Sequence, residues 1–363
     1  MFLRRLLLRN FRNYRLLDLP LEPGITVLFG PNAHGKTNLL EAIYFLATAE
    51  SPRTHETKDL IRLGASDAVV KGRMIDRGRE EVLEIRVLPG RKVAKVGGEP
   101  LPRLSDFVGR LVVVLFTADD LQIVKGPPEL RRAFLDLWLS QGSVAYRHAL
   151  SAYRRALQGR NHLLKLVAEG RYPEEVLDQW DQQVASHGAR VLKLRLKAVE
   201  EMAEHAKEGH RLMGGGELEV RYKATVPLEG DFTSSFLAAL REGRMEDLEK
   251  GATQVGPHRD DLEIFVNGRE CRYFCSQGEQ RTVALALRYA EFKWLWERRG
   301  TPPVLLLDDV MSELDRRRRE RVAELAVQAE QTIITCTEPE AIPEPLLGRA
   351  RLMRVQGGEV RPT

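Results

Sequence analysis

The chain has 363 residues, 43% of them hydrophobic and 30% charged, and its 56 lysines and arginines nearly balance 52 aspartates and glutamates. These values exclude a chain that is mostly disordered, and the length predicts two domains or lobes. A net charge of +4 is too weak by itself to indicate nucleic acid, and no apolar run approaches the roughly 18 residues of a membrane span, so we expect a cytoplasmic protein without a membrane partner.

Strands and one helix are predicted over the first 116 residues. Residues 2–9 and 24–29 have strand character, and residues 111–116 form a very apolar run of the same kind. Residues 39–46 have the apolar spacing of a helix and follow the second strand after one short loop. The amino-terminal part therefore predicts a strand–loop–helix unit early in the chain.

Residues 128–211 have little strand character and much helical character. Apolar side chains recur at spacings of three and four residues in two stretches, which begin at Tyr146 and Trp180. Such spacing places one apolar seam along each helix, and residues 170–173 are the expected turn. We predict two helices of roughly 30–40 residues, each about 45–60 Å long, that pair as a short antiparallel arm.

Strand character returns after the arm. Asn267 and Gly268 predict a tight hairpin turn between strands over 262–266 and 269–274. The elements expected after the hairpin are a helix over 276–298, a buried strand over 304–307, a helix over 316–329 and a strand over 332–336. The three cysteines, Cys271, Cys275 and Cys336, exclude a disulfide framework and a four-thiolate zinc site.

The loop between the second strand and the first helix has the pattern G-x-x-x-x-G-K-T of a P-loop. Its glycines let the loop fold tightly around a phosphate chain, which then faces the positive end of the helix. Lys36 is expected to reach the β- and γ-phosphates and to assist catalysis, and the Thr37 hydroxyl to bind Mg²⁺. The predicted ATP-binding residues are Gly30, Pro31, Asn32, Ala33, His34, Gly35, Lys36, Thr37 and Asn38.

Two carboxylates follow the buried strand over 304–307. Asp308 is predicted to join Thr37 in holding Mg²⁺, and Asp309 to orient or deprotonate the attacking water. Two solvated acids at a strand end are common, but they become significant in a chain that also carries a P-loop.

A serine motif precedes that strand at the start of a helix. Ser276 and Glu279 also fit a capping box, so the motif has a purely structural alternative. Its hydroxyl, glycine and free N–H groups suit a γ-phosphate equally well. We therefore predict that a second copy of the chain supplies Ser276, Gly278, Glu279 and Gln280 to cover the ATP bound by the first.

These motifs together describe an α/β fold, an ABC-type P-loop ATPase head formed from both chain ends with an inserted helical arm. We expect residues 1–116 and 249–363 to form the head and residues 117–248 the arm. Two copies would then bind head to tail, with ATP between them.

The sequence also resembles the RecF family of the SMC/Rad50 group over nearly its whole length. Residues 255–261 (V-G-P-H-R-D-D) are the most family-specific part, because the ATPase motifs occur in many relatives. The other matching segments are residues 10–14 (N-F-R-N-Y), 32–44, 51–54 (S-P-R-T), 116–121, 125–136, 276–281 and 305–315.

The resemblance implies a recombination mediator that works as an ATP-dependent homodimer. Such a protein binds duplex DNA and single-strand/duplex junctions, acts with RecR and indirectly with RecO, and helps RecA to load at single-strand gaps. The chain departs from the wider group in two places. Asp309 stands where many relatives have glutamate, and its shorter side chain predicts slow hydrolysis. We expect a weak ATPase that DNA stimulates and that serves as a switch. No histidine occupies the usual switch position, which leaves Thr335 or Thr337 to replace it.

Candidate DNA contacts come from basic residues of the arm and of the segment before it. They are Arg131, Arg132, Arg154, Arg155, Arg190 and Lys193. Phosphate contacts of this kind dominate affinity for DNA and weaken with salt, although charges along a helix often form only a solvated face. The segment His258–Asp261 could form a metal or catalytic cluster, but we expect an internally paired loop near the ATPase site.

Two alternatives remain at this point. An ABC transporter ATPase subunit would lack the long arm and carry the switch histidine. A DNA clamp that binds ATP without hydrolysing it would share every motif, and only a measurement of phosphate release separates it from an enzyme.

Overall fold

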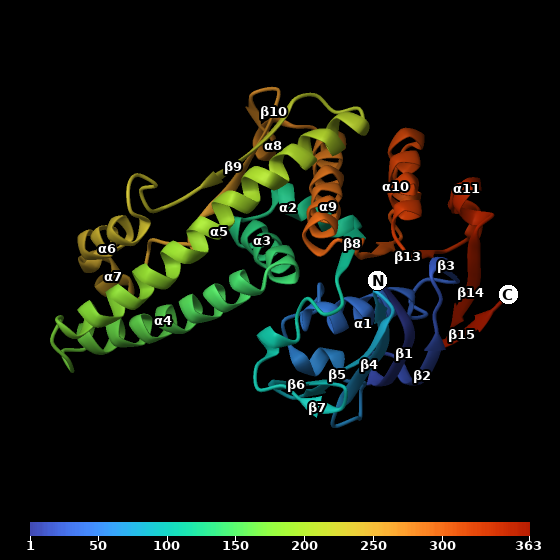
Figure 1. The fold of residues 1–363 in the computed structure, drawn as a ribbon, viewed down its shortest axis with the longest axis horizontal. Coiled ribbons are helices and arrows are strands. Elements are labelled where there is room, and N and C mark those ends of the chain that lie inside the picture. Colours follow the sequence, from blue (N-terminus) through green and yellow to red (C-terminus); the bar gives the residue numbers. More distant parts are fainter. The chain divides into compact units, whose positions relative to one another are not determined.

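The computed structural model describes all residues from 1 to 363 and shows two compact units (Figure 1). The first unit contains Met1–Leu121, Glu208–Gly215 and Arg281–Thr363, and the second contains Gln122–Lys207 and Gly216–Gln280. The division into residues 1–116, 117–248 and 249–363 stays a prediction. None of the helices combines the length and the apolarity that crossing a bilayer demands.

The core of the first unit is a six-stranded sheet with the order β15-β14-β3-β13-β12-β8. Four of its five pairs of neighbouring strands are parallel, and the fifth, β14 with β15, is antiparallel. The strands are β3 (Gly24–Phe29), β8 (Val113–Thr117), β12 (Val304–Asp308), β13 (Gln331–Cys336), β14 (Ala350–Gln356) and β15 (Glu359–Pro362). Since β3 and β8 come from the amino-terminal part and the others from the carboxy-terminal part, the predicted α/β head built from both chain ends is confirmed.

A second sheet in the same unit is antiparallel, with the order β2-β1-β4-β5-β6-β7. Helix α1 (Lys36–Thr48) contacts strands of both sheets. A Cβ at Gly72 of β4 would lie only 2.3 Å from Leu46 of that helix, so the helix packs directly on the strand backbone. The strands are β1 (Phe2–Phe11), β2 (Tyr14–Pro20), β4 (Ala68–Asp76), β5 (Arg79–Leu88), β6 (Arg91–Val96) and β7 (Glu99–Pro100).

The carboxy-terminal part of the first unit adds the helices that flank the Asp308 strand. Helix α9 (Gln277–Arg299) precedes β12, and α10 (Arg316–Gln328) lies between β12 and β13. Asp315 caps α10 by accepting a hydrogen bond from the backbone N–H of Arg318 at 2.9 Å. The short helix α11 (Glu344–Leu347) also belongs to this part, whereas α2 (Leu121–Lys125) follows β8 where the chain passes into the second unit.

The second unit contains the predicted helical arm, with one length corrected. Helix α5 (Val176–Leu212) has 37 residues, as expected, but α4 (Val144–Ala168) has only 25. The first predicted helix is shorter because Ser143 adopts an extended conformation and caps α4, which separates it from α3 (Pro128–Gly142). The predicted turn lies between α4 and α5.

The hairpin of the second unit is also partly corrected. Asn267 and Gly268 make the turn, both with positive φ, and β10 (Asp261–Val266) pairs with β9 (Leu218–Lys223). The returning strand β11 ends at Glu270, so the strand predicted over 269–274 is wrong in its second half. Residues Cys271–Phe274 form the short helix α8 instead, because the Cys271 and Arg272 carbonyls accept hydrogen bonds from the buried Gln280 amide. The remaining helices are α6 (Phe232–Glu242) and α7 (Arg244–Lys250).

Candidate nucleotide-binding site

The P-loop connects β3 to α1 and depends on its two glycines. Gly30 and Gly35 have φ values of 145° and 111°, in the region that side chains disfavour. A Cβ at Gly30 would lie 2.3 Å from the Val355 carbonyl oxygen, and one at Gly35 would lie 2.5 Å from Asn13 Nδ2. Both positions therefore exclude any larger residue, and the loop opens α1 with its N-terminal N–H groups.

The motif N-F-R-N-Y holds this loop from the side. Tyr14 donates its hydroxyl hydrogen to the Gly35 carbonyl at 3.0 Å, and Asn13 donates to the His34 carbonyl at 3.3 Å. Asn38 in turn donates to Asn13 Oδ1 at 2.8 Å. The sequence shows only the family resemblance of this motif, whereas the structure shows that it fixes the P-loop.

The Lys36 side chain folds back onto the backbone of the P-loop. Its ammonium donates to the carbonyl oxygens of Gly30 and Pro31 at 2.7 and 2.9 Å. Burial lowers the pKa of this ammonium, while the carboxylates of Asp309 and Asp308 act in the opposite direction. The cation is thus held beside the loop's backbone, where a phosphate chain would need it.

A hydroxyl–carboxylate chain connects α1 to two strands. Thr37 and Thr335 both donate to Asp308 Oδ1, at 3.0 and 2.7 Å. Burial raises the pKa of Asp308, and the hydrogen bonds from Thr335 and Thr37 oppose that rise. A threonine hydroxyl and a carboxylate are the hard oxygen ligands that Mg²⁺ prefers, so these residues fit the predicted metal.

Asp309 has an unusual backbone conformation. Its φ is 53°, in the left-handed region that aspartate tolerates better than most residues. Its N–H donates to Thr335 Oγ1 at 3.0 Å, and Ser312 donates to its carbonyl at 2.8 Å and to its carboxylate at 3.3 Å. Of the two threonines proposed to replace the switch histidine, Thr335 is the one whose hydroxyl contacts both aspartates.

These groups surround one cavity of about 380 Å³ in the first unit. Arg53 also lines it, and sequence reasoning missed this residue. Its guanidinium donates to Asn38 Oδ1 at 2.7 Å and lies 3.4 Å from buried Glu41. Its position in the loop directly after the P-loop helix is the only feature of the sequence that points to this role. The full lining is Asn32, Ala33, Gly35, Lys36, Thr37, Asn38, Arg53, Asp308, Asp309 and Thr335.

The serine motif forms the capping box that was its structural alternative. Ser276 N and Oγ both donate to Glu279 Oε2 at 2.8 Å, and Glu279 N donates to Ser276 Oγ at 3.3 Å. Ser276, Gly278 and Glu279 are exposed at the start of α9. Gln280 is buried and bonded to the α8 carbonyls, so its expected contact with ATP is replaced by a structural role.

The six residues predicted to contact DNA differ in their burial and in their hydrogen-bond partners. Arg131 is only 3% exposed and holds Asp261 through two hydrogen bonds of 2.7 and 2.8 Å. Its expected DNA contact is therefore corrected to a role in the fold, because a buried, fully paired guanidinium cannot reach phosphate. Arg132 is mostly buried and donates to the Asp260 carbonyl.

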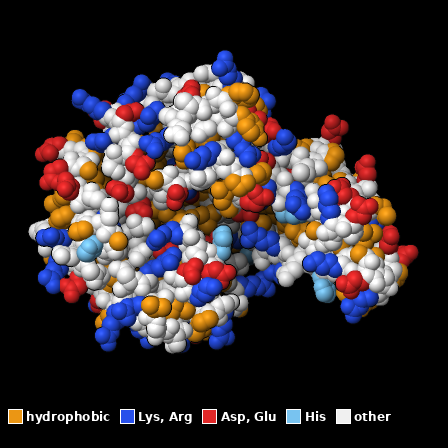
Figure 2. Space-filling model, turned by 180° about the vertical axis from the view of Figure 1, so that it is seen from behind, with side chains coloured by type: hydrophobic (Ala, Val, Ile, Leu, Met, Phe, Trp, Pro, Cys, Tyr) orange, Lys and Arg blue, Asp and Glu red, His pale blue; other side chains and the backbone are white.

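The four remaining candidates are exposed on the arm. Arg154 pairs with Asp136 at 2.9 Å, and Arg155 donates to Ser151 at 2.8 Å. Arg190 and Lys193 have no ion pair or side-chain hydrogen bond. On the face shown in Figure 2, lysines and arginines are interspersed with acidic side chains, so no single basic patch dominates it.

The segment around His258 is paired internally, and its predicted position near the ATPase site stays a prediction. The two ring nitrogens of His258 lie 2.6 Å from the Tyr153 hydroxyl and 2.9 Å from the Thr253 carbonyl. Asp260 accepts hydrogen bonds from Tyr222 and Thr225. The structure contains no cluster of three or more histidine, cysteine or acidic side chains suited to a metal ion.

The fold and the site define the class of protein. A P-loop, a strand that ends in two aspartates and a sheet built from both chain ends are the parts of an ABC-type, SMC-like nucleotide-binding head. The model of the RecF/RecN/SMC N-terminal domain family matches residues 2–345. An SMC head domain from Pyrococcus furiosus, 20% identical with a TM-score of 0.55, shares the fold.

Within that class, the chain belongs to the RecF family. It is 38% identical to the DNA replication and repair protein RecF of Bacillus cytotoxicus, over 99% of this chain and 98% of the relative. The RecF of Clostridium perfringens is 36% identical over 99% and 100%. A solved structure described as the recombination mediator protein RecF-ATP in the RecFOR pathway is 31% identical, with a TM-score of 0.92 over 100% of this chain and 97% of that one.

Proposed function

We propose that this chain is an ATP-switched, DNA-binding recombination mediator of the RecFOR pathway, acting in DNA replication and repair. The observation that carries the proposal is the cavity in which Lys36, Thr37 and Asp308 meet on a P-loop. The match over the full length to a RecF structure described with ATP supports ATP as the nucleotide.

Each cavity residue has a defined task in this proposal. The loop N–H groups and Lys36 bind the β- and γ-phosphates, and Thr37 and Asp308 hold Mg²⁺, which neutralises phosphate charge when bound. Asp309 orients the attacking water and accepts its proton. Its short side chain favours slow hydrolysis, and we expect DNA to stimulate this hydrolysis so that it serves as a switch.

ATP joins two copies of the chain in this proposal. The capping box leaves Ser276, Gly278 and Glu279 exposed at the start of a helix, whose positive dipole end attracts an anion. These three residues of one copy cover the γ-phosphate held by the other. The resulting homodimer acts in the cytoplasm on duplex DNA and single-strand/duplex junctions, with RecR and indirectly RecO and RecA as partners.

Analytical ultracentrifugation with and without ATP tests the composite site. Lys36→Met should abolish both ATP binding and dimerisation, whereas Ser276→Arg should keep ATP binding and lose the dimer, because the serine acts on the other copy. An ATP-dependent dimer in either variant contradicts the arrangement. Steady-state phosphate release with and without DNA separates a slow enzyme from a clamp that never hydrolyses ATP.

A further inference from the structure

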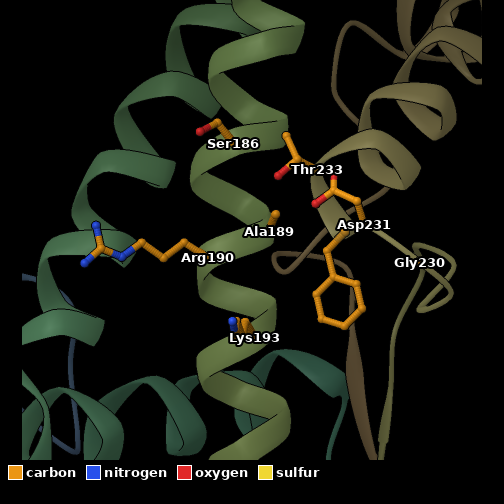
Figure 3. A pocket seen from close by; sticks show the side chains of 8 residues that line it. Ser186, Ala189, Arg190, Lys193, Gly230, Asp231 and Thr233 are labelled. Atoms are coloured by element: carbon orange, nitrogen blue, oxygen red, sulfur yellow. The ribbon is translucent and has the colours of Figure 1, made fainter.

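Two features of the second unit lie outside the nucleotide-binding cavity. One is the groove between α5 and the start of α6, where Arg190 and Lys193, already predicted to contact DNA, line one wall (Figure 3). The other is a pair of cysteines, Cys271 and Cys275, which no part of the proposed function uses. Both are reduced thiols in the structure, so this part of the unit carries reactive groups without an assigned task.

One helical turn separates the two cysteines. Helix α8 begins at Cys271, and the Cys275 N–H closes the turn by donating to the Cys271 carbonyl at 3.2 Å. Residues four positions apart in a helix have Cα atoms about 6 Å apart, and a disulfide is compatible with about 4.4–6.8 Å. The two thiols are also joined by a hydrogen bond. The backbone therefore already holds the pair at a distance that a disulfide can span.

The two thiols differ in their access to solvent. Cys271 is fully buried, and burial together with the hydrogen bond to Cys275 raises the pKa of its thiol. Cys275 is partly exposed. A small oxidant in solution therefore reaches Cys275 first, and Cys271 lies beside it in the position of a resolving thiol.

Cys275 is also the residue directly before the serine motif. The amide of Gln280, in the first turn of α9, donates to the Cys271 carbonyl at 3.2 Å and so ties that turn to α8. A covalent bond between the two sulfurs draws Cys275 toward Cys271. Because Gln280 holds the helix, the displacement falls on the residues between, and Ser276 is exposed and has room to move.

We propose that Cys271 and Cys275 form a modification site at which a hydroperoxide, of which hydrogen peroxide is the simplest, oxidises the two thiols to a disulfide and displaces Ser276. The disulfide follows from the thiol pair alone. Its effect on dimerisation rests on the proposed function, in which Ser276 of one copy covers the γ-phosphate held by the other. Disulfides in the cytosol are usually transient and serve in redox sensing or catalysis, so an oxidised chain keeps its ATP and loses its partner until it is reduced again.

The oxidation balances in two steps. The Cys275 sulfur gives up its proton and attacks one oxygen of hydrogen peroxide, the O–O bond breaks, and a sulfenic acid and one water form. The Cys271 sulfur then attacks the Cys275 sulfur, the S–O bond breaks, and the hydroxyl leaves with the Cys271 proton as a second water. The two thiols lose two electrons, and one peroxide is reduced to two waters.

Mass spectrometry of the full chain before and after treatment with hydrogen peroxide tests the modification. The oxidised wild type should be two hydrogen atoms lighter, and the thiols that react with N-ethylmaleimide in denaturant should fall from all three to one. A dithiol reductant should restore all three. Cys275→Ser should keep both of its thiols. Cys336→Ala is the matched control and should form the disulfide as wild type does, because Cys336 is a buried thiol of β13 outside the pair.

Analytical ultracentrifugation with ATP measures the effect on Ser276. The oxidised wild type should bind ATP as before, but the dissociation constant of its dimer should rise at least about tenfold, because a hydrogen bond to a charged phosphate is lost at each site. Reduction should reverse the change. Cys275→Ser should dimerise equally well before and after peroxide treatment, since it cannot form the disulfide.

Several results overturn the inference. Three reactive thiols in peroxide-treated wild type exclude the modification site. A disulfide that leaves the dimer unchanged excludes the displacement of Ser276, and so does an equal loss of the dimer in peroxide-treated Cys275→Ser, which would assign the effect to another residue. If the untreated wild type forms no ATP-dependent dimer, the proposed function fails, whereas the mass and the thiol count still decide whether the cysteine pair is oxidised.

Discussion

The same charged residue types behave in opposite ways in the two units. In the second unit, Arg160 is fully buried between Asp181 and Asp247, each 2.6 Å away. In the first unit, Lys36 and Asp308 contact backbone carbonyls and hydroxyls at the edge of an open cavity. In the second unit the charged groups pair with each other. In the first unit the charged groups are held by neutral partners and face the cavity.

This difference explains what each set of charges can do. Removing one partner of a buried ion pair strongly destabilises the fold. The donors and acceptors of such a pair are occupied by each other, so the pair cannot bind a ligand. Lys36 and Asp308 are held by neutral carbonyls and hydroxyls, so their charges remain available to bind phosphate and Mg²⁺.

Removing a buried cation should destabilise the second unit most. Arg160→Leu leaves Asp181 and Asp247 without this partner, and we expect the free energy of unfolding to fall by about 3–5 kcal/mol. Urea denaturation measures the loss. Arg316→Leu is the control, because its pair with Glu320 is on the surface and such pairs contribute about 0–1 kcal/mol. If Arg160→Leu lowers the free energy of unfolding no more than Arg316→Leu does, the buried pairs do not stabilise the second unit as proposed.

Removing an anion at the cavity should instead change chemistry and not stability. Asp309→Asn keeps the size of the side chain and abolishes its ability to accept a proton, so turnover should fall by at least about 100-fold. Phosphate release measures the rate, and sedimentation should show an ATP-bound dimer that persists. Unaltered turnover would mean that another group handles the water.

Acid should weaken the second unit through His258. Burial lowers the pKa of this ring to about 4, below its unfolded value of about 6.5. The neutral ring therefore contributes stability that is complete above about pH 6.5 and is lost as the pH falls toward 4, with about 2 kcal/mol gone at about pH 5. The other charged groups near the ring are Arg259, Asp260 and Arg132.

Denaturation at several pH values checks this prediction against His258→Gln, which cannot titrate. The variant should be less stable at pH 7.5 and should lose less stability on acidification than wild type. Parallel pH profiles of the two proteins would assign the acid sensitivity to other groups.

The smallest effect is expected at Thr335, which connects the two aspartates of the cavity. Thr335→Val removes its bonds to Asp308 and to the Asp309 N–H, and we expect turnover to fall about tenfold and the Mg²⁺ requirement to rise. Thr335→Ser should restore both, since it retains the hydroxyl. A loss that serine does not restore would indicate packing and not hydrogen bonding.

Local patterns predicted the nucleotide site more fully than the rest of the molecule. The P-loop was recognisable because its glycines, lysine and threonine lie within eight consecutive residues. Arg53 was missed because nothing in its own loop shows that it turns back to the cavity. Gln280 was assigned to ATP because a linear motif does not reveal which of its members points inward, and here the α8 carbonyls hold it.

The sequence alone determined the α/β class, the P-loop and the acidic strand, because these depend on short-range periodicity and on residues with special conformational or ligand chemistry. Only the tertiary structure decided which charges serve the fold, since pairs such as Arg131 with Asp261 join residues 130 positions apart. It also placed Asp309 in a left-handed conformation and set Thr335 between the two aspartates. Burial and counter-charge are properties of the packed chain, and no window of sequence contains them.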